Sequence, residues 1–184
     1  DLGNLFNRVL SMTHKYFGGT VPEYSTPGEG DEEMFALGRE AMANYQQLLM
    51  RTRFSLGLDA LWEFIRALNK YIDTQAPWAL YKAQDMDRLG SVMYVLLECM
   101  RKASLHLWPI MPDAAVKLCN QLGIELDPDS LDLRTELQGF DGIKAGTTVL
   151  KSSNLFPRVD LENEANNGAK GEARNQAKGK SKDT

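Results

Sequence analysis

The sequence is poor in the residues that build most catalytic and metal sites. Its 184 residues include only two cysteines and two histidines. Cys99 and Cys119 are too few for a disulfide framework, which favours a reducing, cytoplasmic environment. Cys99 and His106 lie seven residues apart, and Cys119 falls elsewhere, so the short ligand spacings of a zinc site are missing. We therefore expect these side chains to pack in the interior and predict no catalytic or metal-binding residue.

Long apolar runs and a leader are missing as well. No run of 18 apolar residues occurs, which excludes a transmembrane span. Residues 1–4 offer neither the basic start nor the apolar stretch of a signal peptide. The first methionine is Met12, so we expect a piece processed or excised from a longer protein.

Positive charge is scarce in the body of the chain. Residues 1–160 hold 16 basic and 21 acidic side chains, a net charge of −5, whereas residues 161–184 hold five and four, a net charge of +1. An acidic body does not bind polyanions through its bulk charge, so a nucleic acid must be met by a local site. The residues after Leu161 include no aromatic and no branched aliphatic side chain, which predicts a flexible low-complexity linker at 161–184 after a folded domain at 1–160.

Apolar residues recur at helical spacing through most of that domain. The pattern predicts five amphipathic helices, at 2–17, about 31–52, about 55–74, 86–107 and from Pro112 to the stop at Gly123. Beyond Gly123 the pattern breaks into short pieces, and Leu155-Phe156-Pro157 is apolar enough to fold back against the helices. Short connections between amphipathic helices are typical of a bundle, so we predict an all-α bundle with an irregular C-terminal return segment.

Two places in the sequence indicate a recognition surface. Asn4 and Arg8 are four residues apart and share a helix face, with Lys15 nearly on the same side. Pro77 breaks the third helix and holds Trp78 outside its apolar stripe. An exposed indole beside amide and guanidinium groups suits an unstacked base, which proteins recognise by stacking and edge hydrogen bonds.

Each of these residues also has an ordinary structural explanation. Asn4 can bond a neighbouring turn, Arg8 can be a solvated charge, and Trp78 can be a core or rim aromatic. Trp62 and Trp108 have ordinary helical and helix-end placements, which predicts packing roles. If the recognition surface exists, Trp78 must be at least partly exposed, and Asn4 and Arg8 must face the same side of the bundle.

Taken together, the motifs resemble the anticodon-binding domain of bacterial methionyl-tRNA synthetases. The resemblance covers roughly residues 1–160 and is most specific at the Ala-Pro-Trp joint. The segments that carry it are Asn4-Leu5-Phe6-Asn7-Arg8, Asn69-Lys70-Tyr71-Ile72-Asp73, Ala76-Pro77-Trp78, Trp108-Pro109-Ile110-Met111-Pro112 and Leu155-Phe156-Pro157-Arg158.

The resemblance implies a role for each matching position. Trp78 stacks on the first anticodon base, cytosine, when the loop bases splay outward. Asn4 and Arg8 hydrogen-bond the first and second anticodon bases, and Arg8 can also meet phosphate. Asp73 and Pro77 match positions that shape this pocket, where a carboxylate can accept a hydrogen bond from the cytosine amine.

Two further positions and several partners follow from the same resemblance. Lys15 is a candidate for phosphate contact, and Asn69 for packing the joint. The family implies a class I ligase that joins methionine to tRNA(Met), with ATP and Mg²⁺ used by a Rossmann-type catalytic domain of the same parent chain, where zinc also belongs. The His-Ile-Gly-His-like and Lys-Met-Ser-Lys-Ser-like motifs of that domain are not in this sequence. We expect no cofactor in this domain, no membrane partner, and a homodimer only through a C-terminal module that is not in this sequence.

Two alternatives stay open. The chain could be a helical docking bundle that binds protein and reads no RNA. It could also be the anticodon domain of another class I synthetase, for cysteine, leucine, isoleucine or valine, although the joint at Ala76, Pro77 and Trp78 argues against that.

Overall fold

The computed structural model describes residues 2–127 and 129–151 of the chain. This part is all-α, as predicted, and the five predicted helices are all present. A short helix that the sequence did not reveal follows Pro77. The elements are α1 (Leu2–Phe17), α2 (Asp31–Met50), α3 (Phe54–Gln75), α4 (Pro77–Ala83), α5 (Met86–Leu107), α6 (Pro112–Gln121) and the 3-10 helix η1 (Thr135–Leu137).

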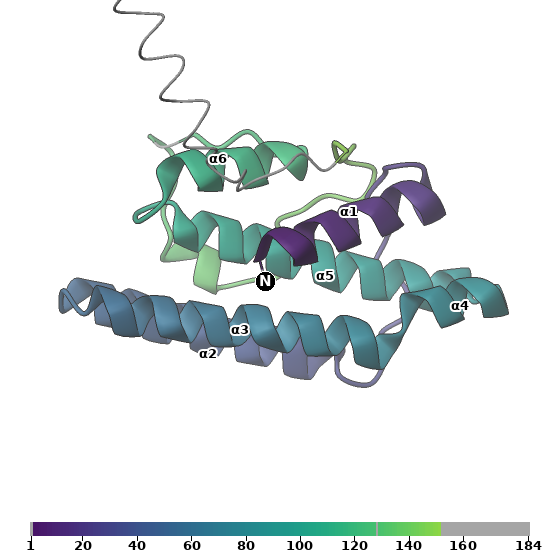
Figure 1. Cartoon of the computed structure of the whole chain (residues 1–184), viewed down its shortest axis with the longest axis horizontal. Helices are drawn as coiled ribbons and strands as arrows, with labels where there is room; N and C mark the ends of the chain where they lie inside the picture. Colours follow the sequence, from purple (N-terminus) through teal and green to yellow (C-terminus); the bar gives the residue numbers. More distant parts are fainter. Residues whose placement is uncertain (1, 128, 152–184) are drawn as a thin grey trace, which may run out of the picture.

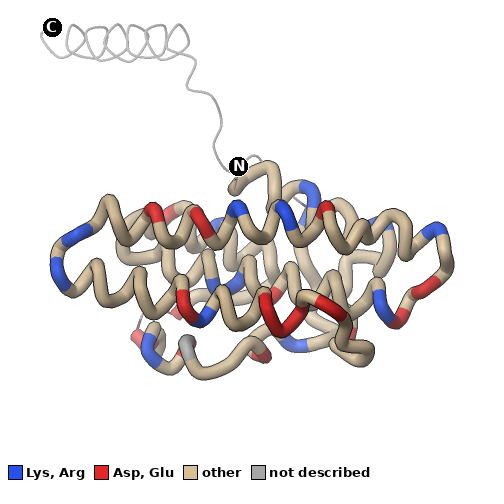
Figure 2. The backbone as a smooth tube through the Cα atoms, turned by 90° about the horizontal axis from the view of Figure 1, so that it is seen from below, with Lys and Arg blue, Asp and Glu red and all other residues tan. Residues whose placement is uncertain are grey.

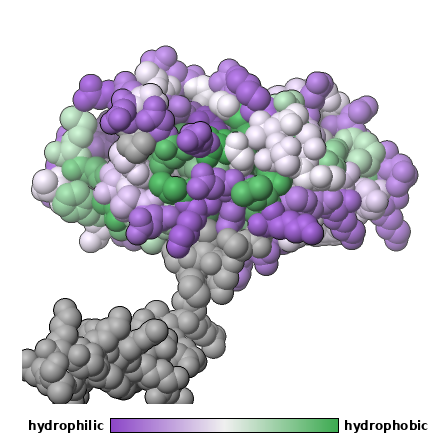
Figure 3. Space-filling view, turned by 90° about the horizontal axis from the view of Figure 1, so that it is seen from above, coloured by the Kyte–Doolittle hydropathy of each residue, from purple (hydrophilic) through white to green (hydrophobic). Residues whose placement is uncertain are grey.

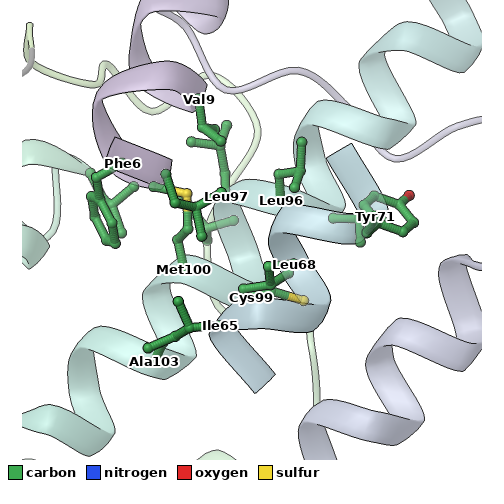
Figure 4. Packing of buried hydrophobic residues seen from close by; sticks show 14 of the residues in the cluster. Phe6, Val9, Ile65, Leu68, Tyr71, Leu96, Leu97, Cys99, Met100 and Ala103 are labelled. Carbon is green, nitrogen blue, oxygen red and sulfur yellow. The ribbon is translucent and has the colours of Figure 1, made fainter. Parts of the chain in front are cut away.

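Helix α5 is the centre of the bundle. The antiparallel pair α2 and α3 forms one layer below it, α1 and α6 lie above it, and α4 lies at one end beside the start of α5 (Figure 1). Every residue of α5 from Leu89 to Leu107 is buried, which explains why its apolar face is the widest in the sequence. Side chains from α1, α3 and α5 meet in the interior (Figure 4), among them Phe6, Leu68 and Met100.

Cys99 and Cys119 are buried in this interior as expected, and His106 is fully buried. Gln46 donates through its amide nitrogen to the Leu133 carbonyl oxygen at 2.8 Å and lies 3.2 Å from His106 Nε2. His106 Nδ1 lies 2.8 Å from the Lys102 carbonyl oxygen, so a neutral ring with its proton on Nδ1 satisfies both contacts. Burial lowers the pKa of His106 to about 4.

The C-terminal part of the described chain returns along the bundle. Val149 donates to the Gly19 carbonyl at 2.8 Å, and Thr20 and Thr148 form an antiparallel bridge. The buried Glu98 accepts hydrogen bonds from the backbone of Ile143 at 2.8 Å. The fold-back predicted for 155–157 and the linker predicted for 161–184 lie outside the described residues.

Trp62 and Trp108 are partly buried and pack against the core, which confirms their predicted packing role.

In the described part of the chain, none of the helices combines the length and apolar character that a bilayer crossing requires. Within the same residues, no group of three or more His, Cys, Asp and Glu side chains could hold a metal ion.

Candidate nucleic-acid interface

A single residue separates α3 from α4. Ala76 adopts a left-handed conformation with φ of 44° and ψ of 62°, and its carbonyl accepts a hydrogen bond from Ala79 at 2.7 Å. Pro77 is the first residue of α4, a position where its missing N–H is not needed. Proline therefore starts a helix here as well as ending one, and Trp78 is held on the first turn of α4.

A network of hydrogen bonds fixes the end of α3 just before this joint. Gln75 accepts from Arg88 Nη2 at 2.7 Å and donates to the Glu29 carbonyl at 2.9 Å. Arg88 also forms a two-pronged pair with Asp31, in which both nitrogen–oxygen distances are 2.6 Å. Tyr71 donates to the same carboxylate at 2.6 Å. The network joins the ends of α2, α3 and α5, so the position of the joint is built into the core.

Asp31 remains ionised in this network despite its burial. Desolvation alone would raise its pKa, but hydrogen bonds from Arg88, Tyr71 and the Gly28 backbone hold the pKa below its usual value. The same carboxylate raises the pKa of the Arg88 guanidinium.

Arg8 and Trp78 come together across α1 and α4. The Arg8 guanidinium carbon lies 5.4 Å from the centroid of the Trp78 ring, within the range of a cation–π contact. Arg8 Nη2 also lies 2.5 Å from Asp73 Oδ1, at the end of α3. The Trp78 side chain is 45% exposed, which confirms the prediction that it is accessible. The structure thus places a base-sized aromatic surface, a planar donor and a carboxylate next to one another.

The remaining predicted residues have different surroundings. Asn4 is exposed one turn before Arg8 on α1, and its side chain makes no hydrogen bond within the described residues. Pro77 is buried and shapes the joint, as its position in α4 requires. Asn69 Nδ2 donates to the Ile65 carbonyl of its own helix at 2.9 Å, so this hydrogen bond stays within α3.

Sequence reasoning missed an aromatic pair beside this group. Tyr16 in α1 stacks on Tyr81 in α4, with ring centroids 4.5 Å apart and an angle of 25° between the ring planes. Lys15 Nζ lies 5.5 Å from the Tyr16 ring centroid. By its spacing, Tyr16 fits the apolar stripe of α1, which alone predicts a packing role. The helical spacing of Trp78 and Tyr81 in α4 was the signal for this pair, and it becomes visible only once Pro77 is recognised as a helix start.

Local charge distinguishes α1 and α4 from the rest of the bundle. These two helices contain no acidic residue and carry Arg8, Lys15 and Lys82. Along α2 and α3, in contrast, acidic and basic positions are interspersed (Figure 2). The face that carries α1 and α6 is mostly hydrophilic, with its apolar side chains in small separate groups (Figure 3). The charged side chains of α1 and α4 are thus all basic, and the carboxylates at this surface come from neighbouring segments, Asp73 at the end of α3 and Asp85 shortly after α4.

Comparison with known families gives one consistent match. The family described as the anticodon binding domain of methionyl tRNA ligase matches residues 21–175, a stretch that begins after α1. The methionine–tRNA ligase of Fusobacterium nucleatum is 37% identical over 165 residues, which are 89% of this chain and 26% of that protein. The corresponding ligase of Halalkalibacterium halodurans is 38% identical over 166 residues, or 89% of this chain and 25% of its own length.

Solved structures agree with the sequence matches. The free form of Mycobacterium tuberculosis methionyl-tRNA synthetase superposes with a TM-score of 0.75 at 29% identity, covering 86% of this chain and 32% of that one. The same enzyme in complex with methionyl-adenylate gives a TM-score of 0.75 at 30% identity, covering 85% and 30%. The chain thus spans about a quarter of the length of the curated relatives it matches.

Proposed function

Because this chain belongs to the family of methionyl-tRNA ligase anticodon-binding domains, we propose that its α1–α4 surface reads the CAU anticodon of tRNA(Met). The parent protein then joins methionine to that tRNA with ATP and Mg²⁺, in a catalytic domain outside this sequence. This domain selects the tRNA by its anticodon and needs no cofactor of its own. The observation that carries the proposal is the Arg8 guanidinium beside an exposed Trp78 ring.

The first anticodon base, cytosine, stacks on the Trp78 indole in this mechanism. Stacking on an aromatic side chain contributes about 1–3 kcal/mol per base and requires the base to leave its own stack. A joint fixed by Gln75 and Pro77 keeps the backbone that carries Trp78 in place before the RNA arrives, so little backbone ordering is needed on binding.

Polar groups around the ring then read the base edges. Asp73 accepts a hydrogen bond from the cytosine amine, and Arg8 donates to acceptors of the first or second base. Arg8 and Asp73 are paired with each other in the free protein, but their side chains are 39% and 62% exposed. An exposed pair contributes at most about 1 kcal/mol, so RNA can replace it at little cost. Asn4 offers both a donor and an acceptor one turn away, and Lys15 offers a charge for phosphate.

Substitution of the indole tests the proposal. Trp78→Ala should weaken binding of a CAU anticodon stem-loop by about 1–3 kcal/mol, measured by anisotropy of the labelled RNA at low salt. Phe54→Leu is the matched control, because Phe54 is 50% exposed in α3, near the α2–α3 connection rather than the joint. Equal affinities of the chain and its Trp78→Ala variant would remove the indole from the mechanism. Failure of the unsubstituted chain to bind the CAU stem-loop would favour a docking bundle, whereas preference for another loop would favour the anticodon domain of another class I synthetase.

A further inference from the structure

We propose that Tyr16 and Tyr81 form a second stacking site, which takes a nucleotide neighbouring the one on Trp78. The inference rests on the proposed reading of the anticodon and extends the contact to another nucleotide of the same loop. Its ligand is a single-stranded RNA base with its flanking phosphate.

The two tyrosines form a ready stacking surface. Their rings already lie 4.5 Å apart and nearly parallel, and Tyr81 is 37% exposed. A base that stacks on the outer face of Tyr81 extends an existing stack, and every base has a π-face with which to do so. Tyr16 supports Tyr81 from behind and limits its rotamers, so less side-chain freedom is lost on binding.

Position along the helices separates this site from the first. Tyr81 follows Trp78 by three residues, so the two side chains share one side of α4. Their positions are about 4.5 Å apart along the helix axis. Because the loop bases splay outward in the proposed complex, each ring can take a different base of the same strand.

Two lysines accompany the tyrosine pair, and the nearest carboxylates along the chain, Asp85 and Asp87, follow the end of α4. Lys15 lies beside the Tyr16 ring, Lys82 follows Tyr81 directly, and neither α1 nor α4 carries an acidic residue. A phosphate that flanks a base stacked on this pair would be attracted by the Lys15 ammonium group beside the Tyr16 ring. The exposed side chains near the α2–α3 connection differ, because Met50 and Leu56 there are aliphatic and Phe54 has no stacked aromatic neighbour among the described residues. RNA is thus a better occupant of the tyrosine pair than an apolar protein surface.

A combination of protein variants and altered loops tests the second site. Tyr81→Leu should lower the affinity for the CAU stem-loop about five- to tenfold, the low end of the range for one stacked base. Tyr81→Phe keeps the ring and should keep the affinity, which separates stacking from general damage to α4. Phe54→Leu again controls for loss of an exposed ring, and far-UV circular dichroism confirms that each variant is folded.

Loops with one abasic nucleotide locate the contact. When the base that contacts Tyr81 is removed, the unsubstituted chain and Tyr81→Leu should bind the loop with equal affinity, and we expect this at one position other than the first anticodon position. Trp78→Ala should bind as tightly as the unsubstituted chain only when the first anticodon base is removed. Unchanged binding by Tyr81→Leu, with Trp78→Ala still weakened, would overturn the second site and leave the anticodon proposal standing. A Tyr81→Leu effect that is the same for every abasic loop would also overturn it, since the ring would then act on the fold or on a protein partner. No binding of the CAU loop by the unsubstituted chain would contradict both proposals.

Discussion

Two arginine–aspartate pairs flank the α3–α4 joint, and their surroundings give them opposite uses. Arg88 and Asp31 have side chains that are 13% and 1% exposed, and further hydrogen bonds reach the same carboxylate from Tyr71 and the Gly28 backbone. Arg8 and Asp73 have one hydrogen bond between them, and their side chains are 39% and 62% exposed. A buried pair cannot lose a partner cheaply, whereas an exposed pair can exchange its partner for a ligand. The buried pair thus fixes the joint, and the exposed pair leaves Arg8 and Asp73 available for bases.

The largest effect is expected at the buried pair. Asp31→Asn keeps the shape of the side chain but leaves the Arg88 charge without its counter-ion, which should lower the free energy of unfolding by about 3–5 kcal/mol. Urea denaturation followed by circular dichroism measures this change. Asp73→Asn makes the same chemical change at the exposed pair and is the matched control. Equal losses in the two variants would break the comparison.

Acid provides a second test of what burial does to an ionisable group. His106 has a folded-state pKa of about 4 because it is buried, whereas an unfolded chain titrates near 6.5. Between these values the unfolded chain binds more protons, so the free energy of unfolding should fall as the pH falls from about 6.5 to about 4, by about 3 kcal/mol in all. Below that range the carboxylates whose pKa values are lowered, Asp31 and Glu136, lose their stabilising interactions too.

Denaturation at several pH values measures the His106 contribution. The His106→Gln variant should show a flatter profile between pH 6.5 and 4, whatever its stability at pH 7. A variant profile that runs parallel to the original would show that another group causes the pH dependence.

The smallest effect on stability is expected at the exposed pair. Asp73→Asn should change the free energy of unfolding by less than about 1 kcal/mol. Its effect should instead appear in selectivity, because asparagine can accept from the cytosine amine and also donate to a uracil oxygen. The ratio of the affinities for stem-loops with C and with U at the first anticodon position measures this selectivity. We expect the ratio to be smaller for Asp73→Asn than for the unsubstituted chain. A preference for C as strong as before would show that Asp73 does not read this base.

Much of the scaffold could be predicted from the sequence because helical periodicity is a local property. Residues 2–17 and 86–107 were predicted with the bounds of α1 and α5, since Gly18 and Pro109 closely follow regular apolar stripes. Helix α4 was missed because seven residues are too few to show a period, and Pro77 was interpreted only as the end of α3.

The site was predictable only in its parts. The sequence indicated Trp78 as a candidate because it follows the helix break at Pro77, and the same break predicted that its side chain is exposed. The pairing of Arg8 with Asp73 joins residues 65 apart, and no local pattern reveals such a contact. The same limit applies to Tyr16, which fits the apolar stripe of α1 by its spacing. Its contact with Tyr81 in α4 depends on the tertiary structure, which the sequence pattern does not reveal.

Tryptophan fluorescence during titration with a CAU anticodon stem-loop at low salt tests the central claim most directly. The chain has three tryptophans, and Trp78 is the exposed one, so subtracting the Trp78→Ala titration isolates its signal. We expect quenching that saturates, that is stronger for CAU than for a loop with its first base changed, and that disappears in Trp78→Ala. Quenching that persists in Trp78→Ala, or that is equal for the two loops, would contradict the reading of the anticodon by this indole.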